Sequence, residues 1–430
     1  EALLARGHSV HVVFDGYKAE SPSDYSLSEF AAKHPGFSWY QGPTRTGLCK
    51  RFVFACRNIR NYMFLVRIGA VDRHTNRMLQ FVPAFYKKLV SVSFLRHMLA
   101  SSAADAVFAA IERCVHPDFH ITRYVRKRDP SLVLVSYRSF PCSSPDIDYL
   151  KSARALGIPP LIITPSWDTL TTKTLIQVEP DEVFVWNEEH AVAANRYHRL
   201  PKEKIKIVGA PHFDAWFALR APSQTREAFA NGFGLSSRVP YLLYIASASA
   251  GKRNPYAVAL IRRACSESTD ERVRSLHIVV RPYPGYEDLA DAHTVSGVTA
   301  LPAPAESRRT LTDDMLFYDS IYHSAAVIAL DSASFFDAMS IGKPCIVYRA
   351  PEFRDIQSAE HFTALIEQLA LYDASSLDTM ASILSQILSG SDVLADSRRE
   401  YLARFIRPRG LGVPVGEAVA DEIEKYLPRA

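Results

Sequence analysis

The chain lacks most of the short motifs by which metal, redox and nucleotide sites are recognised. Its six cysteines form no Cys-x-x-Cys pair and no cluster with histidine, so no metal site or disulfide framework is expected. They are typical of the reduced thiols of a cytoplasmic protein. No glycine-rich dinucleotide loop follows a predicted strand, and no P-loop is present. Any phosphate must therefore be bound by hydroxyl groups, cations and helix N-termini.

Long apolar runs are also absent. No run reaches the roughly 18 residues that a membrane-spanning helix needs. What is present is a chain of 430 residues, 48% of them hydrophobic, which is enough for two ordinary domains with full cores. Helical and strand-like segments alternate along most of it, which predicts an α/β protein with parallel sheets. Strands are expected at 8–14, 131–136, 160–164, 182–186 and 204–208, then at 241–246, 276–281, 298–301, 325–330 and 345–348.

These strands predict two Rossmann-like domains joined at a hinge. We expect a first domain over 1–215, a second over 216–410, and a C-terminal helix over 411–430 that crosses back onto the first. The chain opens on a short helix that ends at Gly7 and leads into the first strand. A parallel domain of this kind has one more strand before such a helix, so we expect a missing first βα unit on the order of 15–20 residues. In such folds that loop is often catalytic.

The segment from Thr44 to Met98 carries most of the positive charge. It holds eleven lysines and arginines and one acid, whereas the whole chain has a net charge of only +4. Aromatic residues are interleaved with these charges. The pattern is typical of basic amphipathic helices that lie on anionic membranes or bind anionic substrates, and equally of packed helices with a solvated basic face. We expect a helical basic insertion at about 44–128. Nucleic acid is not an expected partner, because the pI of about 8.6 is low for such domains.

The segment 325–348 is the most informative about function. A buried strand is followed by a polar turn, a helix that ends at Gly342, and another strand. Ser332 and Ser334 lie where this helix begins, and its free amides and macrodipole favour an anion such as phosphate. Asp337 follows in the first turns, where it could accept a hydrogen bond from a ribose hydroxyl. The alternative is a serine N-cap on an ordinary helix.

Two further strand ends in the second half carry groups suited to a diphosphate. The strand 241–246 opens into a loop of small residues with two cations, and Arg281 ends the next strand, before Pro-Tyr-Pro. Ligands of open α/β sheets bind at the carboxyl ends of the strands. We therefore expect this loop to contact the diphosphate, although a plain turn remains an alternative. Its candidate residues are Ser247, Ser249, Lys252 and Arg253.

Strand ends in the first half carry candidates for acceptor binding and catalysis. In the hydroxyl-rich loop 164–173, Asp168 is a candidate general base, Trp167 a stacking platform and Lys173 an anion contact. Glu188, at the next strand end, is a second candidate base, and Arg138, on a third loop, could meet an acidic acceptor. Both carboxylates have a simpler interpretation as helix caps.

With these residues in view, the chain resembles GT-B-fold nucleotide-sugar transferases. Within that fold it is similar to the bacterial surface-polysaccharide type, which grades into CDP-glycerol glycerophosphotransferases and non-hydrolysing UDP-GlcNAc 2-epimerases. One departure is Tyr283, which stands where the related motif often has a histidine. The resemblance is carried by the segments 5–10, 166–171, 185–188, 209–214, 281–284 and 331–344.

The resemblance implies that the second domain binds the donor and the first binds the acceptor and supplies the base. Ser332 and Ser334 would bind phosphate, Asp337 would lie near the ribose, and Arg281 would neutralise the diphosphate. The nucleotide sugar is then a substrate, and no cofactor is expected. An enzyme that lacks the first loop would still bind the donor even if it does not catalyse the transfer.

The expected function is a metal-independent glycosyltransferase of polysaccharide biosynthesis that acts on a membrane-associated or polysaccharide acceptor. We expect it in the cytoplasm, peripheral at the inner face of the plasma membrane. The alternatives are a polyol-phosphate transferase or UDP-sugar 2-epimerase of the same fold, and a non-catalytic nucleotide-sugar-binding protein.

Overall fold

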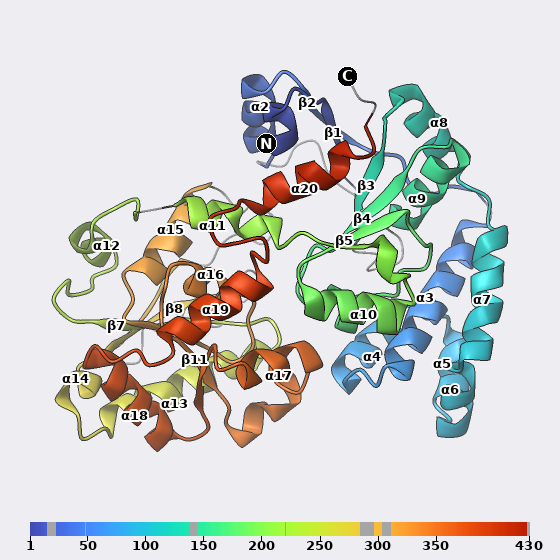
Figure 1. Ribbon diagram of the computed structural model, residues 1–430. Helices are drawn as coiled ribbons and strands as arrows, with labels where there is room; N and C mark the ends of the chain where they lie inside the picture. The colour runs from blue at the N-terminus through green and yellow to red at the C-terminus, as the bar shows by residue number, and fades with distance from the viewer. Residues whose placement is uncertain are drawn as a thin grey trace. The chain divides into compact units, whose positions relative to one another are not determined.

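The structure is a computed structural model that describes residues 1–14, 23–47, 49–137, 144–219, 221–283, 296–302 and 311–427. The chain forms two compact units (Figure 1). The chain divides after Pro211 and after Arg404, and its C-terminal segment belongs to the first unit. Unit 1 comprises Glu1–Glu20, Leu27–Pro211 and Phe405–Ala430, and unit 2 comprises Ser21–Ser26 and His212–Arg404.

Unit 1 contains two parallel sheets. Four strands pair in sequence order, β3-β4-β5-β6, and β1 and β2 form a separate pair. β2 was not predicted, because its sequence Phe-Ser-Trp-Tyr-Gln lacks the apolar run of a buried parallel strand. In the structure the side chains of this strand are half-buried or exposed. The strands are β1 (Val10–Phe14), β2 (Phe37–Gln41), β3 (Val133–Ser136), β4 (Pro160–Ile163), β5 (Glu182–Val185) and β6 (Ile205–Ile207).

The C-terminal helix α20 (Val415–Glu424) packs on unit 1, as predicted. Ile423 is buried with Phe184 and Val208, and Val419 packs against the same cluster. Gly209 allows the last segment to come close, because a Cβ there would lie 2.7 Å from the carbonyl oxygen of residue 406. The other helices of unit 1 outside the insertion are α1 (Ala2–Ala5), α2 (Ser23–Lys33), α9 (Asp146–Ala155) and α10 (Glu188–His198).

The insertion between β2 and β3 is helical, which confirms the prediction from the sequence. Its apolar core includes Met63, Phe64 and Tyr86. The helices are α3 (Lys50–Arg67), α4 (Asp72–Leu79), α5 (Ala84–Val90), α6 (Ser93–Leu99), α7 (Ser102–Cys114) and α8 (Phe119–Arg128).

Part of the basic charge of the insertion is buried. The Arg57 guanidinium donates to both oxygens of Asp148 and both oxygens of Glu112, at 2.7–3.0 Å. Arg60 donates to Asp105 at 2.8 Å. The basic surface is therefore smaller than the composition indicates, because these charges are neutralised by acids outside the 44–98 segment. Within the described part of the insertion, the buried arginines are Arg45, Arg57 and Arg60.

Unit 2 is built on a six-stranded parallel sheet with the order β12-β11-β10-β7-β8-β9. The first strand, β7, lies beside β10, and the chain fills one side of the sheet before the other. β12 was not predicted, because it has only three residues and forms an edge. The strands are β7 (Tyr241–Ile245), β8 (His277–Arg281), β9 (Val298–Ala300), β10 (Ala326–Ala329), β11 (Cys345–Tyr348) and β12 (Tyr372–Ala374).

Helices surround this sheet, and they bury an apolar core drawn from every strand. Most relevant to the site is α13, a helix of 13 residues that follows β7. The helices are α11 (Asp214–Ala218), α12 (Arg226–Gly232), α13 (Asn254–Ser266), α14 (Glu271–Arg274), α15 (Leu311–Tyr322), α16 (Ser334–Ser340), α17 (Glu360–Glu367), α18 (Leu377–Leu388) and α19 (Ala395–Phe405).

Candidate functional site

The sheet of unit 2 has a topological switch point between β7 and β10. From β7 the chain proceeds outward through β8 and β9, and from β10 it proceeds the other way through β11 and β12. In open α/β sheets the loops separate at such a point and leave a crevice that binds ligands. The loops after β7 and β10 are those that the sequence assigned to phosphate. Arg281 pairs with Ile245 at the end of β7, so these three segments lie at one edge of the sheet.

Asn254 holds the loop after β7 in shape. Its Oδ1 accepts hydrogen bonds from the Tyr244 hydroxyl at 2.8 Å and the Ser247 amide at 3.2 Å. Its Nδ2 donates to the carbonyl oxygens of Ser247 at 3.0 Å and Gly251 at 2.7 Å. The residue is only 1% exposed. Sequence reasoning missed it, although an asparagine that follows a glycine-containing loop and precedes a helix proline was a usable signal.

The four predicted residues of this loop have different environments. Ser247 is buried, and its Oγ lies 3.0 Å from the Oγ of Ser249 and accepts the amide of residue 250 at 3.3 Å. Ser247 therefore shapes the loop, whereas Ser249 is half-buried and Lys252 is exposed. Arg253 is paired with Asp355 at 2.7 and 3.0 Å, and these bonds raise the pKa of its guanidinium. Lys252 is thus the more accessible cation.

Arg281 is buried at the end of β8, where it is 5% exposed. Its guanidinium lies over the Phe317 ring, 4.5 Å from the centroid, and its Nη2 is 3.5 Å from the carbonyl oxygen of Asp313. A guanidinium on an aromatic face is attracted by the ring quadrupole. This packing restricts the side chain, so that its charge is held at the carboxyl end of β8, beside β7.

The turn after β10 differs in detail from the expectation. The amide of Ser334 donates to the Ser332 Oγ at 3.1 Å, so one of the amides predicted to face an anion already has a partner. Neither serine is the N-cap of α16; that position is Ala333, which makes no side-chain cap. Asp337 is half-buried in the first turn. Ser334 stays a candidate through its hydroxyl.

Gln357 ties together two strand ends beside this turn. Its Nε2 donates to the carbonyl oxygens of Leu330 at 2.7 Å and Tyr348 at 2.8 Å, after β10 and β11. Its Oε1 is buried and has no hydrogen-bond partner among the described residues. The sequence offered no signal for this contact, because it depends on the pairing of β10 with β11.

In unit 1, the loop after β4 orients Asp168. Its Oδ1 accepts from the Ser166 hydroxyl at 2.6 Å and lies 2.8 Å from the Lys173 Nζ. Its Oδ2 is 3.2 Å from the Thr172 hydroxyl. The carboxylate is therefore fixed in direction and paired with a cation. Lys173, which was predicted to contact an anion of the acceptor, is engaged by Asp168 instead.

The other predicted residues of unit 1 fit their proposed roles less well. Trp167 is 7% exposed, so most of its ring is already covered, and its carbonyl accepts from the His190 Nε2 at 2.9 Å. Glu188 is exposed in the first turn of α10, where the helix macrodipole stabilises a carboxylate. The cap itself is Asn187, whose side chain accepts the amide of His190 at 2.8 Å. Arg138 lies outside the described residues.

Buried polar atoms without partners gather around the Asp168 loop. In the described residues, the Oγ1 atoms of Thr169 and Thr171 and the Nδ1 of His190 have no hydrogen bond. Burial lowers the pKa of His190 to about 4, so the imidazole is neutral at pH 7. Such atoms in native proteins usually meet water or a ligand, which makes this loop a candidate polar site.

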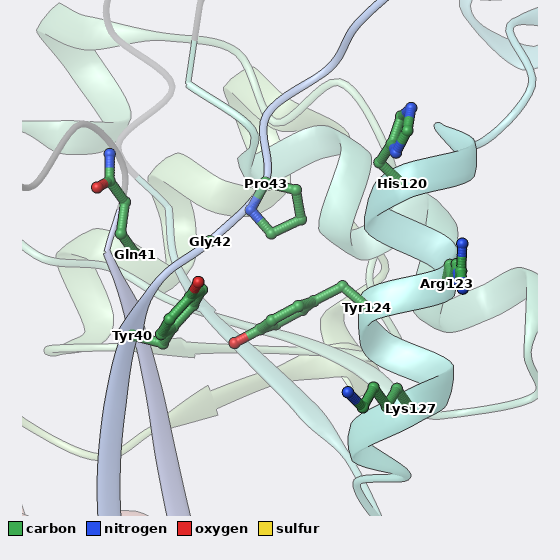
Figure 2. Close-up of a pocket in the computed structure, with 8 residues that line it drawn as sticks. All are labelled: Tyr40, Gln41, Gly42, Pro43, His120, Arg123, Tyr124 and Lys127. Atoms are coloured by element: carbon green, nitrogen blue, oxygen red, sulfur yellow. The ribbon is translucent and has the colours of Figure 1, made fainter.

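A pocket with a volume of about 530 Å³ lies elsewhere in unit 1 (Figure 2). The rings of Tyr40 and Tyr124 are stacked at its side, with centroids 6.2 Å apart and planes at 21°. The lining contains three basic residues and no acid, which suits a polar or anionic group. Sequence reasoning did not single it out. Its lining residues are Tyr40, Gln41, Gly42, Pro43, His120, Arg123, Tyr124 and Lys127.

No protein-family model and no curated protein matches the chain. Solved structures do match. The co-structure of S. aureus MnaA with UDP is 12% identical, with a TM-score of 0.52 over 97% of this chain and 96% of that chain. The UDP-GlcNAc 2-epimerase from Neisseria meningitidis bound to UDP-GlcNAc is 13% identical, with a TM-score of 0.49 over 97% and 100%. CalG4, the calicheamicin glycosyltransferase, is 13% identical, with a TM-score of 0.47 over 100% and 93%.

At these identities the likeness shows the fold. The match to MnaA extends over nearly all of both chains, and the chain has the GT-B type of fold with two Rossmann-like domains. This confirms the predicted fold class. The narrower assignment to the CDP-glycerol group stays a prediction.

Proposed function

We propose that the protein is a nucleotide-sugar-dependent glycosyltransferase whose donor binds at the β7–β10 switch point of unit 2. The observation that carries this proposal is the strand order, because it gathers the serine-rich loop, the Ser332–Ser334 turn and Arg281 at one edge of a parallel sheet. Ligand binding at such an edge is the general behaviour of open α/β sheets.

The groups at this edge suit a nucleoside diphosphate. The 13-residue helix α13 begins directly after this loop, so the positive end of its macrodipole lies beside the loop. Ser249 and Lys252 offer a hydroxyl and an accessible cation, and Ser334 adds a hydroxyl in the turn after β10. Arg281 adds a fixed positive charge. Preorganised donors of this kind stabilise the charge that develops on a leaving diphosphate.

We assign the role of general base to Asp168, held by Ser166 and Lys173. The carboxylate would take the proton of an acceptor hydroxyl while the hydroxyl oxygen attacks the anomeric carbon of the donor sugar. The bond between that carbon and the diphosphate oxygen would break at the same time. The acceptor is a hydroxyl of a membrane-associated or polysaccharide molecule. Glu188 is the second candidate, although its exposure in the first turn of α10 favours a structural role. The setting proposed for this reaction is the cytoplasm, at the inner face of the plasma membrane.

Thermal unfolding with UDP, GDP, CDP and dTDP tests the donor site. A nucleotide at 100 times its dissociation constant stabilises a protein by about 2.7 kcal/mol. UDP is the first choice, because it is the ligand in the MnaA co-structure. Loss of a charge-assisted hydrogen bond costs about 1.5–3 kcal/mol, so Arg281→Met should weaken binding about 10- to 100-fold. Ser334→Ala should weaken it less.

Arg263→Met is the matched control, since Arg263 is exposed on α13 and its guanidinium pairs with Glu267 at 2.8 Å. It should bind as the wild type does. If none of the four nucleotides shifts the unfolding temperature, the donor site is wrong. If Arg281→Met and Arg263→Met bind equally well, Arg281 has no part in it.

Product analysis separates the remaining functions of this fold. Release of nucleoside diphosphate only when acceptor is added supports glycosyl transfer. Isomerisation of the donor without acceptor supports a UDP-sugar 2-epimerase, and release of nucleoside monophosphate supports a polyol-phosphate transferase. Binding without any turnover supports a nucleotide-sugar-binding protein.

A further inference from the structure

The helices α5 and α6 expose an unusual number of apolar side chains. They lie together at one end of the insertion (Figure 1). Within residues 81–98 fall six of the nineteen large hydrophobic side chains that are exposed in the described chain. Isolated exposed apolar residues are normal, but a concentration of them marks an interaction site. We call this set the α5–α6 surface: Phe81, Phe85, Leu89, Val92, Phe94 and Met98.

The fold does not need these side chains for its own core. The adjoining face of α5, about 100° around the helix, supplies Tyr86 and Val90, which are 3% and 4% exposed and pack into the insertion core. Phe85 and Leu89 lie one turn apart on the outer face, and Phe94 is 75% exposed on α6. Helical spacing of i and i+4 places such residues on one side. The apolar side of α5 is therefore wider than its contact with the core, and Phe85 and Leu89 lie outside that contact.

The charge around this surface has one sign. Lys88 is exposed on α5 beside Phe85 and Leu89, whereas Lys87 and Arg96 are half-buried and the Lys87 Nζ donates to the Gln80 carbonyl at 3.1 Å. The sequence contains no acidic residue from 73 to 104. The next acid, Asp105, is 3% exposed and bonded to Arg60. A surface that combines bulky apolar groups with basic side chains and lacks carboxylates complements an anionic lipid bilayer.

The geometry favours a helix pair that lies on a membrane over one that crosses it. In the described residues no single helix is long and apolar enough to span a bilayer, and the pair α6 and α7, which meets length and composition together, is bent by 53°. Helix α7 is also held in the fold, because its Asp105 and Glu112 bond to Arg60 and Arg57 of α3. Only the outer side of α5 and α6 is available.

We propose that the α5–α6 surface docks the protein on bilayers that contain anionic phospholipid. Phe85, Leu89 and Phe94 enter the boundary between headgroups and acyl chains, and Lys88 meets the lipid phosphates. The basic insertion is thereby divided into a buried part that stabilises the fold and a small exposed part that binds lipid. This surface is independent of the donor site in unit 2.

Vesicle flotation with the whole protein tests the proposal. Vesicles of phosphatidylcholine alone are compared with vesicles that also contain about 30% phosphatidylglycerol, at low and high salt. The wild type should float with the anionic vesicles and less so at high salt. Phe85→Ser/Phe94→Ser should reduce partitioning by more than about 100-fold, since burying each phenylalanine is worth about 1.5–3 kcal/mol. Lys88→Gln should reduce it about fivefold.

The matched control is Phe119→Ser, because Phe119 is 69% exposed on α8, outside the α5–α6 surface. It should float as the wild type does. No flotation of the wild type at low salt overturns the proposal, and so does an equal loss in Phe119→Ser. If sedimentation shows a dimer that the double phenylalanine variant dissociates, without vesicle binding, the surface is a protein interface instead. Nucleotide-induced thermal shifts of all variants should be unchanged, which keeps this test separate from that of the donor site.

Discussion

Replacement of Arg57 by methionine is expected to destabilise unit 1 strongly. The guanidinium is fully buried and makes four hydrogen bonds of 2.7–3.0 Å to Asp148 and Glu112. Methionine fills part of the volume but leaves two buried carboxylates with one cation each, Arg45 for Asp148 and Lys151 for Glu112. Removal of one partner from a buried ion pair costs about 3–5 kcal/mol. We expect a loss in that range.

The assay is urea unfolding followed by tryptophan fluorescence. Three of the four tryptophans, Trp39, Trp167 and Trp186, belong to unit 1, so a Trp216→Phe background reports on that unit alone. This matters because a chain of two units does not have to unfold in one transition. A change in the urea concentration at the unfolding midpoint, with the dependence of the free energy on urea unchanged, gives the change in the free energy of unfolding.

Arg51→Met is the control for this experiment. Arg51 lies on the same helix, α3, but is exposed, and exposed substitutions usually change stability by less than about 0.5 kcal/mol. Equal losses in Arg51→Met and Arg57→Met would refute the reasoning, because burial and pairing would then have no effect. A loss below about 1 kcal/mol in Arg57→Met would show that the two carboxylates find other compensation.

Two further predictions concern the donor loop and the response to acid. Asn254→Ala leaves the Tyr244 hydroxyl and the backbone of the loop without partners, so unit 2 should lose about 2–3 kcal/mol of stability and its affinity for UDP, measured by calorimetry, should fall about tenfold. Asn254→Asp keeps the two hydrogen bonds that the side chain accepts and should lose less of both. Unchanged UDP affinity in both variants would contradict this role of Asn254. Burial lowers the pKa of His190 and His198 to about 4. The unfolded chain therefore binds protons first, and stability that is full above pH 6.5 falls as the pH approaches 4, by up to about 3 kcal/mol for each histidine. Urea unfolding between pH 7 and pH 4.5 checks this, and an unaltered slope in His198→Asn would count against it.

Sequence reasoning predicted the buried elements well. All ten predicted strands are present, with ends shifted by no more than two residues. Runs such as Val327-Ile328 and Val279-Val280 are buried on both faces, and a continuous apolar stretch between turn residues is a strong local signal. The two missed strands, β2 and β12, lie at sheet edges and lack such runs.

The candidate site was predictable only in part. The positions of Ser249, Lys252 and Arg281 at strand ends follow from the local sequence. The supports of the site were not predicted, since Asn254 and Gln357 act through hydrogen bonds whose partners are backbone groups of the folded loops and strands. Glu188 illustrates the reverse case, because a carboxylate at a strand end also suits the first turn of a helix.

The sequence by itself determined where the strands lie, that they are parallel and buried, and which polar turns follow them, because these properties depend on neighbours within a few residues. The tertiary structure decided the rest. It placed β7 beside β10 and so created the switch point, paired Lys173 with Asp168, and buried Arg57 while leaving Lys88 at the surface. Strand order and charge pairing depend on contacts between residues far apart in the chain, and neither the composition nor the local sequence pattern predicts these contacts.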